Sequence, residues 1–195
     1  NGRGTVAENH HVGPIHPEYA KLPPLKVDPA GAKALLAEAG MADHEFELIS
    51  IDDAFQAATC DAVAAQIRDA GINIKRTVLP GSTFWNNWLK YPFSATEWNM
   101  RPLGVQVLSL AYRSGEAWNE SAFSNEEFDT LLARANSIAD ADARRVVMKR
   151  IEEIIGGRVF PPLPCLGQSI HPIRRARLIA SLKTIRFCNR QEKGK

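Results

Sequence analysis

The hydrophobic positions early in the chain recur at helical spacing. Between Asp28 and Gly40, small and aliphatic side chains form one apolar stripe along the predicted helix. Asp28 has the side chain of a good N-cap, and Gly40 suits the left-handed backbone that commonly ends a helix. This pattern predicts a helix that begins after Asp28 and ends before Gly40.

The pattern then changes period twice. Residues 45–51 alternate between apolar and polar side chains, as a strand does. Residues 53–70 return to helical spacing and are followed by Gly71, and residues 72–79 are rich in β-branched side chains. Strand, helix and strand with short connections predict a βαβ unit with two parallel strands.

The middle of the chain is rich in aromatic residues. A short amphipathic helix is predicted over residues 82–89, with Trp85 and Trp88 facing the core. The remaining predicted elements are a third strand at 93–99, a helix at 105–112, a loop at 114–125, and helices at 125–137 and 140–155. Little regular structure is expected in residues 1–27 and 157–195, which are interrupted by glycine, proline or basic residues.

Composition and charge narrow the class of protein. Of the 195 residues, 45% are hydrophobic and 24% are charged, as in soluble globular proteins. The net charge of +2 is too small to indicate nucleic acid as a partner. The sequence contains no run of eighteen apolar residues, so no transmembrane helix is predicted. It begins at Asn1, so we expect an incomplete N-terminus with no signal peptide in view.

Chemical motifs for catalysis are lacking in the sequence. No GxSxG nucleophile elbow, Walker loop or GxGxxG fingerprint occurs, so we expect no enzymatic activity and no cofactor. Three cysteines without a CxxC pair do not indicate a zinc site, and Cys60 is expected to be a small helix residue. The alternative is a small stand-alone metal-dependent α/β enzyme using His10, His11 and His16, although a solvated loop is the simpler interpretation of this cluster.

Two tryptophans and an arginine are the best candidates for ligand contacts. Trp98 and Trp118 lie at the end of a predicted strand and in a loop, where clefts of α/β proteins commonly lie. Arg101 follows the same strand and can hold a carboxylate or a phosphate. The full set of predicted ligand-binding residues is Trp98, Asn99, Met100, Arg101, Trp118, Asn119 and Phe123.

Several stretches, in the same order along the chain, resemble a known family. They are DPAGAKALLAEAGM (28–41), VAAQIRDAGINIKRTVLP (63–80), STFWNNW (82–88), WNESAFSNEEFDTLLARA (118–135) and DADARRVVMKRIEEII (140–155). These stretches resemble the family 5 solute-binding proteins of ABC importers, the group that binds dipeptides, oligopeptides and nickel. The opening residues 2–20 resemble the loop by which such chains re-enter the C-terminal lobe.

The resemblance implies an α/β fold, namely the C-terminal lobe of a two-lobed, periplasmic-binding-protein-like fold of type II with an irregular C-terminal tail. The implied domains are an inter-lobe segment (1–27) and a solute-binding lobe (28–156). The remaining tail (157–195) departs from the family pattern, and the alternatives are a rearrangement, a frameshift or natural divergence. The implied partners are a peptide-like or anionic solute, the missing N-terminal lobe, and the permease and ATPase of an importer. The implied location is periplasmic or extracytoplasmic, at the membrane through the transporter.

One departure from the family bears on the ligand. In peptide-binding members, an aspartate after the strand matching residues 93–99 pairs with the amino terminus of the peptide. This chain has Met100 and Arg101 in that stretch and no acidic residue. A guanidinium there would invert the charge preference, so the resemblance implies an anionic or neutral group at this point of the ligand.

Overall fold

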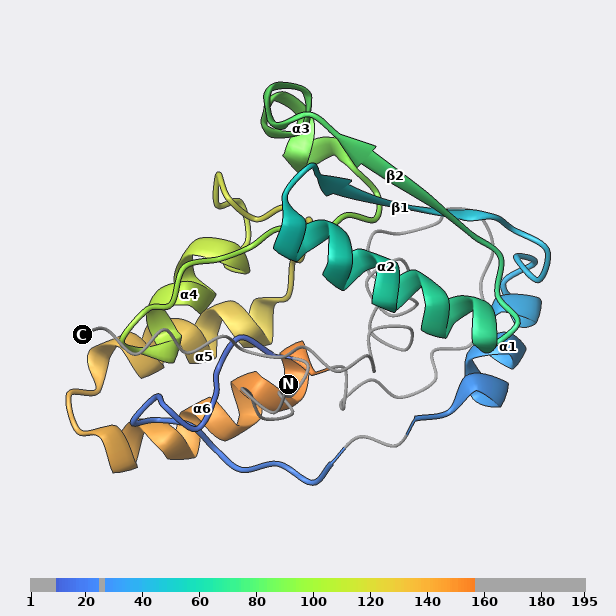
Figure 1. The fold of residues 1–195 in the computed structure, drawn as a ribbon. Helices are drawn as coiled ribbons and strands as arrows, with labels where there is room; N and C mark the ends of the chain where they lie inside the picture. Colours follow the sequence, from blue (N-terminus) through green and yellow to red (C-terminus); the bar gives the residue numbers. More distant parts are fainter. Residues whose placement is uncertain (1–9, 25–26, 157–195) are drawn as a thin grey trace.

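The computed structural model describes residues 10–24 and 27–156, and it has the predicted α/β fold. Strands β1 (Phe46–Ile51) and β2 (Ile74–Leu79) pair in parallel, with Phe46 opposite Ile74 and Ile51 opposite Leu79. Helix α2 (Ala54–Asp69) connects them and packs on both strands (Figure 1). The predicted βαβ unit is therefore confirmed.

The remaining elements follow the predicted order closely. They are α1 (Pro29–Glu38), α3 (Gly81–Asn87), the 3-10 helix η1 (Trp88–Lys90), α4 (Gly104–Ala111), α5 (Glu126–Ser137) and α6 (Ala141–Ile155). Side-chain caps explain where several of these helices begin. The carboxylate of Asp28 accepts from the Gly31 N–H, and that of Asp140 accepts from the Ala143 N–H, each at 2.8 Å.

The described residues form two hydrophobic cores. The first joins α1, α2 and the strands, and its fully buried members include Leu36, Leu48 and Ala64. The second joins α4, α5 and α6, around Phe128 and Met148. Figure 1 shows these as an α/β unit and a helical unit side by side.

The loop before the first helix belongs to the helical unit. Residues 10–22 run along α6 and α4 (Figure 1), and Val12 is buried in the second core. The buried Glu18 accepts from the Val105 N–H at 3.2 Å, and the buried Glu152 accepts from the Ala20 N–H at 3.2 Å. Side chains from both ends of the described chain therefore hold this loop in place.

Two expectations are corrected by the structure. The third strand, predicted over 93–99, is reduced to one parallel bridge between Ser94 and Ile49. The indole of Trp85 is 46% exposed and does not face the core, whereas Phe84 on the same helix is fully buried. Cys60 is buried and free in α2, as predicted. Cys165, Cys188 and the predicted tail lie outside the described residues.

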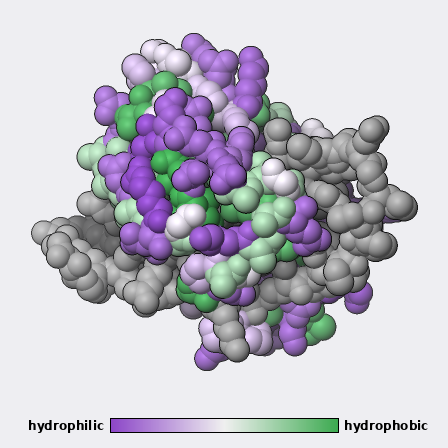
Figure 2. Space-filling model, turned by 90° about the vertical axis from the view of Figure 1, so that its right-hand side faces the viewer, coloured by the Kyte–Doolittle hydropathy of each residue, from purple (hydrophilic) through white to green (hydrophobic). Residues whose placement is uncertain are grey.

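Hydrophilic side chains dominate the face that carries α1. Figure 2 shows this face, where small hydrophobic areas are separated by hydrophilic ones. Most residues of α1 are exposed, and only Ala32 and Leu36 are buried. This side is an ordinary solvated surface, so the candidate site lies elsewhere.

Candidate functional site

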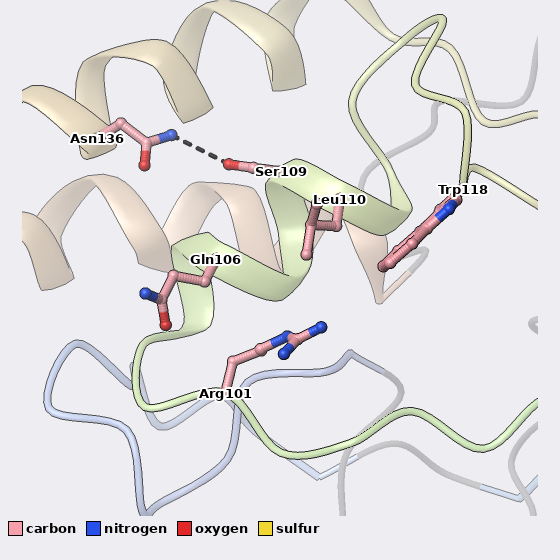
Figure 3. A pocket seen from close by; sticks show the side chains of 6 residues that line it. All are labelled: Arg101, Gln106, Ser109, Leu110, Trp118 and Asn136. Carbon is pink, nitrogen blue, oxygen red and sulfur yellow. Dashed lines mark hydrogen bonds between the residues drawn. The ribbon is translucent and has the colours of Figure 1, made fainter.

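A cavity opens beside α4 in the helical unit. It has a volume of about 530 Å³ and is lined by Arg101, Gln106, Ser109, Leu110, Trp118 and Asn136 (Figure 3). Cavities of about this size hold small solutes in many proteins. Its lining combines one cation, three neutral polar side chains and two apolar ones.

Arg101 is positioned by the loop that precedes α1. The Gly13 N–H donates to Nδ1 of His16 at 2.9 Å, which leaves the Nε2–H of His16 to donate to the Arg101 carbonyl at 3.0 Å. The Nε of Arg101 is buried and has no hydrogen-bond partner among the described residues. In Figure 3 the guanidinium points along the cavity towards Trp118.

One face of α4 supplies the floor of the cavity. Ser109 and Leu110 follow Gln106 by three and four residues, so helical geometry places both on the same side of α4 as Gln106. The Gln106 Oε1 accepts from the Leu103 N–H at 3.2 Å, which fixes this side chain at the start of the helix. Asn136 of α5 donates to Ser109 Oγ at 3.2 Å and closes the far end (Figure 3).

Trp118, which lines one side of the cavity, lies in the loop between α4 and α5. Trp118 is 49% exposed, and its ring packs edge-on against Trp98 with centroids 6.0 Å apart. The Trp98 Nε1–H donates to Glu120 at 3.0 Å, and the Thr96 hydroxyl donates to the other oxygen of Glu120. Glu120 thus ties the stretch 96–98 to the loop and keeps Trp118 at the cavity.

Asn119 and Phe123 shape this loop from within. The Asn119 amide donates to the carbonyls of Tyr112, Arg113 and Phe123, and its Oδ1 accepts from the Phe123 N–H at 3.1 Å. The Phe123 ring packs edge-on against Phe128, at a centroid distance of 5.1 Å. The polar atoms of Asn119 are therefore used inside the loop, and its predicted contact with a ligand stays a prediction.

Tyr112 is partly buried and packs edge-on against Phe123 of the loop. Burial raises the pKa of its phenol well above the usual value, and the nearby Glu120 carboxylate raises it further. Tyr112 therefore stays neutral at physiological pH and acts as an apolar support.

The other predicted site residues differ in their placement. Arg101 and Trp118 are brought together at the cavity, and Trp98 supports Trp118. Asn99 and Met100 are exposed beyond the lining, Met100 by 69%. Four cavity residues were not predicted: Gln106, Ser109, Leu110 and Asn136.

The three histidines do not converge on one point. His16 uses both ring nitrogens on the backbone, and the buried His10 lies 3.7 Å from Glu152, so neither lies in a solvated loop as expected. His11 is exposed and packs edge-on against Tyr112 at 5.4 Å. Within residues 10–24 and 27–156, no group of three or more potential ligands is placed to hold a metal ion. The described residues give no support to the metal-enzyme alternative.

Solved structures with the same fold are binding proteins. The oligopeptide-binding protein AppA from Bacillus subtilis matches with a TM-score of 0.65 and 20% identity, over 79% of this chain and 35% of its own. The Escherichia coli murein tripeptide binding protein MppA matches with a TM-score of 0.67 and 21% identity, over 78% and 32%. NikA from Staphylococcus aureus, solved with Ni(L-His)2, matches with a TM-score of 0.64 and 20% identity, over 78% and 34%.

These likenesses show the fold, and the chain spans about a third of the length of each of these proteins. No curated protein matches the sequence. No helix in the described part of the chain combines the length and the apolar character needed to cross a bilayer.

A family model matches more than half of the sequence. It is described as "Bacterial extracellular solute-binding proteins, family 5 Middle" and matches residues 1–120. The matched range contains the βαβ unit, Arg101, the helix α4 and Trp118. The chain belongs to the family 5 bacterial extracellular solute-binding proteins.

Proposed function

We propose that this chain is a lobe of the substrate-binding component of an ABC importer. In this proposal, the protein captures a peptide or a similar small solute between this lobe and a second one and delivers it to the permease. The observation that supports this proposal best is the cavity, which brings Arg101 and the exposed Trp118 together in a chain of family 5. The Nε of Arg101 has no hydrogen-bond partner among the described residues. The role is binding without catalysis, outside the cytoplasmic membrane.

The proposed binding mechanism follows from the lining of the cavity. Trp118 offers a flat apolar surface with a polar edge, and Leu110 extends this surface along α4. Closure of a second lobe over the solute would remove water from both and would strengthen each polar contact in the site. Trp98 and Arg101 remain proposed ligand-site residues, with Asn99 and Met100 at the rim.

The loop before α1 supports the same site in this proposal. His16 binds the backbone of Arg101, and the exposed ring of His11 packs near Trp98 and Tyr112. Residues 10–24 would therefore support the cavity, within the longer segment 1–27 that is the proposed connection between lobes.

The test is solute binding by the complete natural protein that contains this chain. A pool of tripeptides is titrated in, and binding is followed by native mass spectrometry for the wild type, Trp118→Ala and Trp85→Ala. Trp85 is the matched control, because its exposed fraction of 46% is close to the 49% of Trp118 and it does not line the cavity.

We expect Trp118→Ala to weaken retention of tripeptides at least tenfold and Trp85→Ala to leave it unchanged, since stacking on a tryptophan contributes about 1–3 kcal/mol in recognition of flat groups. Equal loss in both variants would place the site elsewhere. No retention by the wild type would contradict the proposed function.

A further inference from the structure

We propose that the Arg101 cavity binds a carboxylate group of the solute. This inference rests on the proposed function and adds the chemical class of the ligand. The ligand would be a small carboxylate attached to an apolar or aromatic body, with its charged end at Arg101 and its body against Trp118 and Leu110.

The charge of Arg101 lacks the compensation that comparable arginines have. Four other arginines are partly or fully buried, and each contacts a carboxylate: Arg76, Arg144, Arg145 and Arg150. Arg101 is half-buried, and no carboxylate among the described residues contacts it. A buried cation without a counter-charge is unfavourable, and an anionic ligand would relieve this.

The shape of the guanidinium favours a planar anion. The Nε of Arg101 is buried, so the terminal nitrogens, which point along the cavity in Figure 3, are the donors that a ligand can reach. A carboxylate can accept from two donors of one guanidinium at once, in two parallel hydrogen bonds. This geometry needs the fork of arginine, so a lysine ammonium would not replace it fully.

The rest of the lining agrees with this orientation. None of the six lining residues is acidic, so no group in the cavity would repel an anion or attract a cation. Glu116 and Glu120 are each two residues from Trp118 in sequence, and neither lines the cavity. Glu116 accepts from Arg113, and Glu120 accepts from Thr96 and Trp98. The amide of Gln106 and the Ser109–Asn136 pair provide neutral polar contacts for the rest of the solute.

The experiment compares acids with their neutral amides on the complete natural protein. One pair of probes is a pool of tripeptides with free carboxyl ends and the same pool amidated at the C-terminus. The other pair is phenylacetate and phenylacetamide, which separates an organic acid from a peptide as the source of the carboxylate. Dissociation constants are measured by calorimetry for the wild type, Arg101→Gln, Arg101→Lys and Arg68→Gln.

We expect the wild type to bind the acid of at least one pair tenfold or more tightly than its amide, and Arg101→Gln to abolish that difference. Arg101→Lys keeps the positive charge and should retain part of the preference for the acid. Arg68→Gln removes one exposed positive charge from α2, outside the cavity, and should retain the full preference for the acid.

Three outcomes would count against the inference. Equal affinity for acids and amides in the wild type would overturn it and leave the proposed function standing, because solutes are still bound. A preference for acids that survives in Arg101→Gln would also overturn it. Absence of saturable binding by every probe would contradict the proposed function together with the inference. The comparison of probes on the wild type tests the proposal even if Arg101→Gln fails to fold.

Discussion

Gly104→Ala is a sharp test of how the loop of residues 10–22 packs on α4. In most helices, replacing glycine by alanine stabilises a protein by about 0.4–1 kcal/mol, because the unfolded chain loses freedom. Here a Cβ atom on residue 104 would lie 2.8 Å from both Cγ atoms of Val12 and 3.4 Å from the terminal methyl of Met148. Contacts this short require the neighbouring atoms to move.

The neighbours of Gly104 have little room to move. Val12 is 2% exposed and Met148 is fully buried, and both belong to the core of the helical unit. Overfilling a packed core lowers the free energy of unfolding by about 1–3 kcal/mol. Subtracting the usual gain of alanine leaves a predicted net loss of about 1–2 kcal/mol for Gly104→Ala.

A double-mutant cycle isolates the contact. Val12→Ala removes two methyl-sized groups, which by itself lowers stability by about 1.6 kcal/mol or more. In that background the added Cβ fills space, so Gly104→Ala should become neutral or stabilising. The favourable coupling should be about 1–3 kcal/mol. Gly13→Ala is the control within the same loop, since its Cβ would meet no atom within 4 Å.

The assay is urea unfolding of each variant followed by far-ultraviolet circular dichroism, with midpoints compared at a common slope. Gly104→Ala at least as stable as the wild type would show that Val12 does not approach α4 as closely as described. An equal loss with and without Val12 would place the origin of the effect elsewhere.

Three further predictions concern the loop beside the cavity. Asn119→Ala should lower the free energy of unfolding by about 1 kcal/mol, because partly buried backbone groups of the loop lose their partner. Limited proteolysis should then cut within residues 113–123, and an unchanged cleavage pattern would contradict this role. Because the pKa of Tyr112 is raised, the folded protein keeps a proton that the unfolded chain releases above about pH 10. The free energy of unfolding should therefore fall as the pH rises past about 10. Tyr112→Phe should remove this contribution, which is measured as a smaller fall of the urea midpoint. Trp98→Phe keeps the ring packing but loses the hydrogen bond to Glu120, so it should lower stability by about 1 kcal/mol, measured by thermal unfolding, and no change would show that this bond does not hold the loop.

The order of the elements could be predicted because each has a local signal. Asp28 and Gly40 act within a few residues of α1, and both act as expected. Asp140 caps α6 in the same local way. Strand pairing is less local. Ser94 pairs with β1, but the strand stops there, because Thr96 and Trp98 are held by Glu120 of a later loop.

The candidate site was predicted only in part, because some of its residues are brought together by non-local contacts. Arg101 and Trp118 were identified from their residue types at the ends of elements. Gln106, Ser109 and Leu110 could have been added from their helical spacing, which places them on one face of α4. Asn136 could not, since nothing local shows which face of α5 meets α4. His16 contacts Arg101 across 85 residues of sequence, a relation that no local pattern reveals.

The contact between the loop of residues 10–22 and α6 has a consequence for the order of folding during synthesis. Ala20 and Glu152 are 132 residues apart, and the whole α/β unit lies between them in sequence. At about 5–20 residues per second, the ribosome needs roughly 7–26 s to add the partner that the loop requires. The helices and strands of the α/β unit are complete in sequence by Leu79, so this unit can fold within that interval. The helical unit must wait, and during this time Val12 and its neighbours are open to chaperones and proteases.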